Sequence, residues 1–303
     1  MKFTQIPAPV QLCDIVRYCW TLESSDRAAT EEGPDITADP GTTADPDLPS
    51  GAPGAPADPP LTFRTFRTMA DGCPGIIFQH PAAGAFHKDD QRLPEIFLYG
   101  QSTQHAELSL SGKFNAIGLC LYPNALRSLF GLKAEELTDS CMDLNHMARR
   151  QGFRLAEQLA DIRASGEKVQ LLADYLSVQS GSNSRITDAP MQYALSQILH
   201  SKGSHPLKTL QDTLQMTERS FERKFKQWVG ISPKLFARIC RFQASLTQLR
   251  NNDYQKLSDI AFENDYADQS HLIRSFKEFA GLSPNQYQKQ CNEVVENLAE
   301  LIQ

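Results

Sequence analysis

Two basic pairs recur along the chain at one spacing. Arg223 and Lys226 stand three residues apart, and Arg274 and Lys277 repeat this pair 51 residues later. An arginine can bond both acceptors on the edge of a guanine, whereas a lysine suits phosphate oxygens. These residue types therefore fit a nucleic acid, and their repetition predicts two contacts rather than one.

The repeat extends well beyond the basic pairs. The stretches "SFERKFKQWVGISPKLF" (220–236) and "HLIRSFKEFAGLSPNQY" (271–287) agree in their Arg, Phe, Lys, Gly and Ser-Pro positions. Ahead of each stretch lies a short amphipathic segment, 206–214 or 257–265, and then a residue suited to cap a helix, Thr217 or Asp268. A glycine fitted to end that helix follows, and Ser-Pro opens another. Helix, turn and helix is the layout in which the second helix enters a major groove.

The second helix of each copy has two distinct faces. The apolar residues at helical spacing, which we expect in the core, are Phe221, Phe225, Val229, Leu272, Phe276 and Phe279. The polar residues left outside are Arg219, Glu222, Arg223, Lys226, Gln269, Ser270, Arg274 and Lys277. One such face could be merely solvated, but basic residues at matched positions in both copies favour a binding surface.

Charge is distributed unevenly along the chain. The 303 residues carry a formal net charge of −6. Residues 201–290 hold 14 Lys and Arg against 9 Asp and Glu, whereas the remainder holds 16 against 27. An acidic protein is a poor general polyanion binder, but a locally basic module can neutralise phosphates. The charge thus permits nucleic acid at the repeated part only.

Residues 200–290 closely resemble the DNA-binding domain of the AraC/XylS family of bacterial transcription regulators, above all in "YADQSHLIRSFKEFAGLSPNQY". The resemblance implies two helix-turn-helix units, at about 207–230 and 257–281, joined by a long helix at 232–252. It also implies sequence-specific binding to double-stranded promoter DNA, with RNA polymerase as a further partner, and it leaves both activation and repression open as the mode of regulation. The base-facing residues that it implies are Arg219, Glu222, Arg223, Gln269, Ser270, Ile273 and Arg274. Asp265 stands where the family usually has glycine, and we expect it to tolerate a left-handed backbone.

The region before the repeat has a different pattern. Short β-type runs, among them "IVRYCWTL", "GIIFQH", "EIFLYG" and "NAIGLCLY", indicate a sandwich or a small barrel, and helical spacing follows within 123–179. Between positions 24 and 60 there are eight Pro, four Gly and eight acidic residues without an aromatic, which predicts a disordered insertion. The fold class is therefore α+β, with a β-rich domain at 1–180, a linker at 181–190 and an all-α domain at 191–303.

Motifs such as "VRYCWTL", "DGCPGIIF" and "YGQST" resemble, more weakly, a sensor-type domain found ahead of this DNA-binding module in many uncharacterised regulators. We expect this domain to bind a small-molecule effector, whose identity the resemblance does not supply, or a second copy of the chain.

Catalytic and metal-binding motifs are missing from the sequence. It has no phosphate-binding glycine loop and no H-E-x-x-H, and "GQSTQ" lacks the last glycine of a nucleophile elbow. His80, His87 and His105 lack tight ligand spacing, and the seven cysteines include no C-x-x-C. We therefore expect no enzyme, no metal and no cofactor. The competing hypothesis is a cysteine- or metal-dependent sensor or enzyme that uses the DNA-binding module for targeting. Cys73 is its candidate thiol, although its only charged neighbour in the sequence, Asp71, has the wrong sign to stabilise a thiolate.

No apolar run approaches the length of a membrane span, so we expect a cytoplasmic protein without a membrane partner. The tail "CNEVVENLAELIQ" has an amphipathic pattern. We expect it to pack on its own domain, with a dimer or polymerase contact as the alternative.

Overall fold

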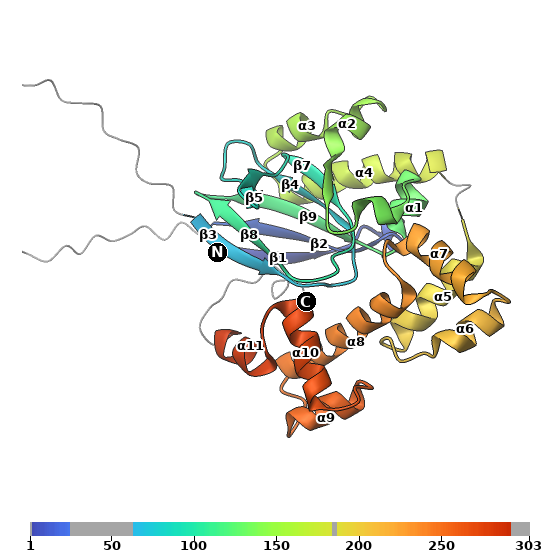
Figure 1. The fold of residues 1–303 in the computed structure, drawn as a ribbon. Coiled ribbons are helices and arrows are strands. Elements are labelled where there is room, and N and C mark those ends of the chain that lie inside the picture. Colours follow the sequence, from blue (N-terminus) through green and yellow to red (C-terminus); the bar gives the residue numbers. More distant parts are fainter. Residues whose placement is uncertain (1, 25–62, 184–186, 292–303) are drawn as a thin grey trace, which may run out of the picture.

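The computed structural model describes residues 2–24, 63–183 and 187–291 (Figure 1). The expected insertion at 24–60 and the amphipathic tail at 291–303 lie outside these residues, apart from Ser24 and Cys291. Within the described part of the chain, no helix is both long and apolar enough to cross a membrane.

The first half of the chain forms two antiparallel sheets. One has six strands in the order β1-β2-β9-β4-β7-β10, and the other has four in the order β3-β8-β5-β6. The strands are β1 (Lys2–Pro7), β2 (Val16–Glu23), β3 (Phe63–Thr68), β4 (Gly75–Gln79), β5 (Phe86–Lys88), β6 (Gln91–Arg92), β7 (Ile96–Tyr99), β8 (Ala106–Ser111), β9 (Asn115–Leu121) and β10 (Cys141–Asp143).

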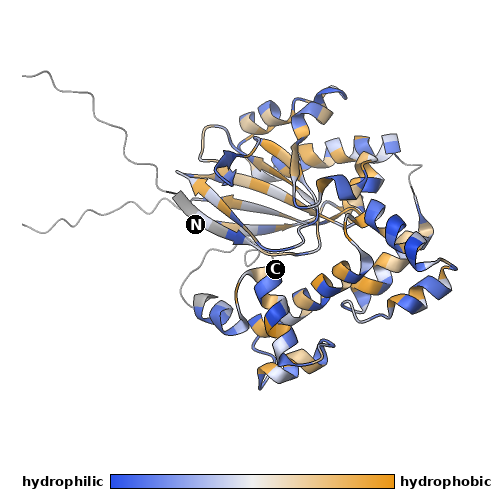
Figure 2. Cartoon of the chain, viewed as in Figure 1, coloured by the Kyte–Doolittle hydropathy of each residue, from blue (hydrophilic) through white to orange (hydrophobic). Residues whose placement is uncertain are grey.

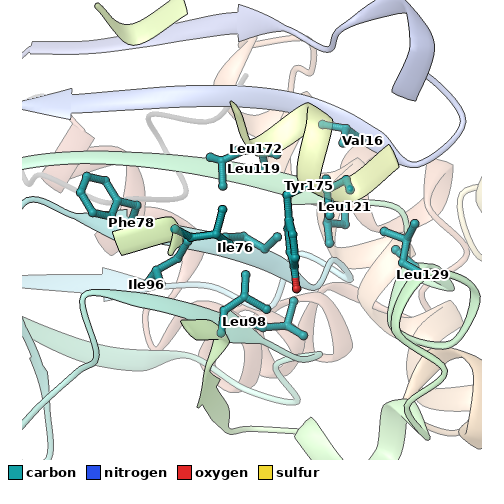
Figure 3. Packing of buried hydrophobic residues seen from close by; sticks show 14 of the residues in the cluster. Val16, Ile76, Phe78, Ile96, Leu98, Leu119, Leu121, Leu129, Leu172 and Tyr175 are labelled. Carbon is teal, nitrogen blue, oxygen red and sulfur yellow. The ribbon is translucent and has the colours of Figure 1, made fainter. Parts of the chain in front are cut away.

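Successive side chains of a strand point to opposite faces of the sheet, so the central strands of the six-stranded sheet contribute to two separate cores. Trp20 and Ile77 face the four-stranded sheet, where they pack with residues such as Phe86 and Leu110. The opposite face of the same strands carries Ile76, Phe78 and Leu119, which pack under the helices (Figure 3). The six-stranded sheet is therefore buried on both faces, which explains the nearly continuous apolar runs in its sequence.

Helices close the second face of that sheet. They are α1 (Ala125–Phe130), α2 (Leu144–Arg149), α3 (Leu155–Asp161) and α4 (Ser165–Asn183), with one-turn helices η1 (Val10–Leu12) and η2 (Ala134–Leu137). Leu172 and Tyr175 of α4 lie over the strands with Leu129 of α1 (Figure 3).

The remaining helices form the second half. They are α5 (Ala189–His200), α6 (Leu207–Thr213), α7 (Glu218–Val229), α8 (Pro233–Arg250), α9 (Leu257–Glu263), α10 (Gln269–Ala280) and α11 (Pro284–Cys291). The α+β class, with β-rich and all-helical parts in that order, is confirmed. The short strands β5, β6 and β10 were not predicted, and α4 runs to Asn183, so the first residues of the expected linker are helical.

The two halves share one interface. Met69 and Ala70, which follow β3, belong to the core of the helical half. The amide Nε2 of Gln243 on α8 donates to Ala70 O at 2.6 Å, and Thr138 Oγ1, just after η2, donates to Gly230 O at 2.8 Å. Helix α7 packs on both α1 and η2. The helical half therefore rests directly on the first half.

The sandwich depends on a close approach at Gly118. This residue lies opposite Trp20 in the ladder, and a Cβ atom there would stand 2.2 Å from Trp20 Cε2. We expect Gly118→Ala to lower the free energy of unfolding by about 1–3 kcal/mol because the ring has no room to move in a packed core. Gly166→Ala is the matched control, since nothing lies within 4 Å of its Cβ position. Urea denaturation of both variants measures the difference; equal stabilities would contradict the packing argument.

Candidate nucleic-acid interface

Helix α7 is defined at both ends by its sequence. Thr217 is its N-cap, and Thr217 Oγ1 accepts from the backbone N–H of Ser220 at 3.3 Å. Gly230 ends it with φ of 100°, a conformation that favours glycine. The residues on its inner face are buried: Phe221, Phe225, Trp228 and Val229. The predicted caps and core of this helix are confirmed.

Helix α10 repeats this construction. Asp268 Oδ1 accepts from the backbone N–H of His271 at 2.8 Å, and Gly281 ends the helix with φ of 73°. Its inner face buries Leu272, Ser275, Phe276, Phe279 and Ala280. Figure 2 shows polar and apolar residues alternating along both helices, as two-faced helices require. The second copy therefore has the architecture predicted from the first.

The turns of the two copies differ by one residue. Met216 N donates to Gln211 O, and Tyr266 N donates to Ala261 O, each at 2.9 Å. These equivalent bonds are 50 residues apart, whereas α7 and α10 begin 51 residues apart. The extra residue is Ala267, between the turn and the N-cap. Asp265 has φ of 54°, so the expected left-handed conformation at this position is confirmed.

The structure places most of the predicted contact residues in solvent. Six are exposed, namely Arg219, Arg223, Gln269, Ser270, Arg274 and Lys277, and three are half-buried, namely Glu222, Lys226 and Ile273. Lys226 Nζ lies 3.0 Å from Glu222 Oε1, one turn earlier on α7. Arg274 Nε lies 3.4 Å from the backbone oxygen of Ser270, one turn earlier on α10. Each helix therefore offers an exposed arginine at the middle of its outer face.

Helix α8 holds both of these helices. Phe236 packs against Phe225 of α7, with ring centroids 5.8 Å apart. Phe242 packs edge-on against Phe276 of α10 at 5.2 Å. On the side of the second copy, Arg241 Nη1 donates to Asp265 O at 3.1 Å, and Arg238 pairs with Glu278. The two outer faces are thus fixed relative to one rod, which is the arrangement expected for 232–252.

The histidines of the first half do not gather into one site. His80 Nε2 lies 3.2 Å from Ala160 O, and His87 Nδ1 lies 2.9 Å from Ala85 O. His105 Nδ1 lies 3.1 Å from Glu278 O, at the end of α10. No sequence pattern predicted this last contact, because it joins positions 173 residues apart.

Known proteins match the chain in two separate regions. The family described as "Helix-turn-helix domain" matches residues 210–290, and a "Domain of unknown function (DUF6597)" matches residues 57–143. Residues 210–290 are an AraC-type helix-turn-helix domain. The AraC-type domain comprises α7 to α10 together with the end of α6 and most of α11.

Relatives extend over different lengths. An uncharacterized HTH-type transcriptional regulator of Haemophilus influenzae is 29% identical over 113 residues, which is 37% of this chain and 38% of that protein. The chain thus spans under two fifths of this curated relative. Two crystal structures of ToxT from Vibrio cholerae are 14% and 13% identical, with TM-scores of 0.39 and 0.40. They cover 75% and 77% of this chain and 97% and 99% of their own.

The cap of α10 in the AraC-type domain can be tested by itself. Asp268→Ala removes the side-chain acceptor of the His271 N–H and leaves only the longer bond to the backbone oxygen of residue 268, so we expect the free energy of unfolding to fall by about 1 kcal/mol. Asp268→Asn keeps an acceptor oxygen, so its free energy of unfolding should fall by much less. Urea denaturation measures both. Equal losses for alanine and asparagine would mean that the carboxylate does not act as a cap.

Proposed function

We propose that this chain is a sequence-specific DNA-binding transcription regulator in which α7 and α10 read two successive segments of the major groove. The observation that carries the proposal is the pair of capped helices with matched, exposed Arg223 and Arg274, both held by α8. Two such helices on one rod can meet one face of a duplex about one turn apart, roughly 34 Å.

Each proposed contact follows from side-chain chemistry. Arg223 and Arg274 suit guanine, Gln269 suits adenine, and Glu222 can accept from the amino group of cytosine. Ile273 is half-buried and suits the methyl group of thymine. Arg219 and Ser270 complete the proposed base-facing set, whereas Lys226 and Lys277 are assigned to phosphates.

We assign regulation to the first domain. The proposed division is a domain at 1–180, a linker at 181–190 and a DNA-binding domain at 191–303. A small molecule or a second copy of the chain bound to the first domain would bias the placement of α7 and α10, because both halves share a core. RNA polymerase is the proposed downstream partner, the proposed location is the cytoplasm, and no catalytic step is assigned to the chain.

If α7 and α10 each read one segment of the major groove, substitutions in the two helices should affect different base positions. Arg223→Ala and Arg274→Ala should each relax the preference for one base, at positions about one helical turn apart in the bound site. Each loss should be about 1–3 kcal/mol if the arginine contacts guanine through two bonds. Selection of bound fragments from random DNA, with the full chain, measures both.

Arg149→Ala is the control, because this arginine is also exposed but pairs with Glu157 of α3 in the first domain. It should leave the selected sequence unchanged. Loss of preference at one shared position in both test variants would show that only one helix reads DNA, and the second copy would then be a support.

Lys226 should behave differently from the arginines. Lys226→Ala should weaken binding to all sequences alike and lower the slope of log affinity against log salt by about one, since a phosphate contact releases a counterion. Lys208→Ala provides the matched control and should leave the slope unchanged, because this lysine also pairs with a carboxylate one turn away, Asp212 at 3.0 Å, but lies on α6 outside the proposed contact set. Titrations at several salt concentrations test this. A loss confined to one base position would instead assign Lys226 to base reading.

A further inference from the structure

A cluster of reactive groups lies inside the first half, beside the helical half. Ligand atoms of Asp71, Cys73 and Cys120 all stand within 4.8 Å of one another. Cys73 precedes β4 and Cys120 lies on β9, the strand paired with β4. Each cysteine is 1% exposed. No other such group of His, Cys, Asp and Glu occurs among the residues that the structure describes.

Arg17 gives this cluster its distinctive chemistry. It reaches across from β2, and its Nη1 atom donates to Cys73 Sγ at 2.7 Å. A guanidinium that donates to sulfur stabilises a thiolate, which is the nucleophilic form of cysteine. The sequence alone showed only Asp71 beside Cys73, because Arg17 is 56 residues away along the chain.

The second sulfur is arranged as a proton donor. The Cys120 thiol donates a hydrogen bond to Cys73, and this bond together with burial raises the pKa of Cys120 well above its usual value. Cys120 therefore stays a thiol. Cys73 Sγ accepts from Arg17 and from Cys120, and it lies 3.8 Å from the backbone oxygen of Asp71, to which a Cys73 thiol would donate. Asp71 opposes a negative charge on Cys73, although burial raises the pKa of this carboxyl to about 6.

A metal ion fits this cluster poorly. A divalent cation held by two thiolates and a carboxylate would lie beside the guanidinium that already contacts Cys73. The cluster also offers only three ligand atoms among the described residues, whereas structural zinc sites have four protein ligands. The same guanidinium favours chemistry that starts from an anionic sulfur.

A cavity lies next to the cluster. A cavity of about 790 Å³ between the two halves is lined by Arg17, Asp71 and Gly72 on one side and by Cys240 of α8 on the other. Arg17 and Asp71 both contact Cys73, which is itself 1% exposed, so a peroxide in this cavity reaches the sulfur when these side chains move.

We propose that Cys73 and Cys120 form a reversible disulfide when the protein meets a peroxide, and that this bond changes how the first half supports α8 and α10. The Cys73 thiolate attacks one peroxide oxygen, the O–O bond breaks, and with one proton from solvent the products are a sulfenic acid and water or an alcohol. The Cys120 thiol then attacks the Cys73 sulfur and releases water. One peroxide is reduced by two electrons, which come from the two thiols, and a thiol reductant reverses the change.

The backbone next to Cys73 carries the effect to the helices. Ala70 N donates to Phe279 O of α10 at 3.1 Å, and Ala70 O accepts from Gln243 of α8. Gly72 has φ of 75°, and a Cβ atom there would stand 3.3 Å from Phe236 of α8. A bond of about 2.0 Å between sulfurs that stand within 4.8 Å of each other draws Cys73 and Cys120 together, and these contacts transmit any shift of the Cys73 segment.

The first test is chemical and uses the full, reduced chain. Treatment with hydrogen peroxide, alkylation of the remaining thiols and peptide mass spectrometry should show a Cys73–Cys120 link before exposed Cys13 is oxidised. Cys19 is the internal control, because it is as buried as Cys73, and burial raises its pKa to about 11. It should stay reduced.

Charge variants separate this proposal from simple exposure. Arg17→Met should slow oxidation of Cys73 at least about tenfold, because it removes the positive charge that stabilises the thiolate. Asp71→Asn should speed the oxidation, because it removes the carboxylate that opposes a negative charge on Cys73. Oxidation of Cys13 first, a Cys73–Cys240 link, or thiols protected by a stoichiometric metal until a chelator is added would each overturn the proposal.

The second test concerns coupling and rests on the proposed function. The oxidised chain should differ from the reduced chain in affinity for its selected DNA site by at least about threefold, with reversal by a thiol, and Cys120→Ala should abolish the difference. Equal DNA affinities of the oxidised and reduced chains would overturn the proposed effect of the disulfide on DNA binding, but not the formation of the disulfide itself. A disulfide that forms in a chain unable to bind DNA in either state would overturn the coupling together with the proposed function.

Discussion

The packing of phenylalanines along α8 is the constraint on which the helical half depends. Phe236 fixes α7 through Phe225, and Phe242 fixes α10 through both Phe276 and Phe279. All of these rings are fully buried. Because a packed core permits few alternative arrangements, the outer faces of α7 and α10 cannot turn independently of each other. The orientation of two distant surfaces is therefore set by one row of aromatic contacts.

Much of this half could be predicted because its determinants are local. Thr217, Asp268, Gly230 and Gly281 act within one turn of the residues that they cap, so their spacing alone locates both helices. The one-residue difference between the turns was not predicted. A comparison of the repeats at a single offset of 51 aligns α7 with α10 but misplaces the preceding helices by one position.

The first half was predictable in class but not in its contacts. Apolar runs such as Ile76 to Phe78 indicate strands, yet the same run gives no sign of which face meets the helices. The strand pairs that define the six-stranded sheet join residues far apart, for example Trp20 and Gly118. The contact between Arg17 and Cys73 depends on how the strands pair. Asp71, the neighbour in sequence, argued against a thiolate at Cys73, whereas in the folded chain the Arg17 guanidinium donates a hydrogen bond to the Cys73 sulfur.

Communication between the halves depends on where they meet. Ala70 and Gly230 make their contacts between the halves through backbone atoms, and a backbone cannot move at one residue without moving the next. Ala70 bonds both α8 and α10, while Thr138 bonds the end of α7. A shift in the first half is therefore imposed on all three helices, whereas their outer residues keep the same positions along each helix. Regulation through this interface would move α7, α8 and α10 together relative to the first half, without altering the chemistry by which α7 or α10 contacts DNA.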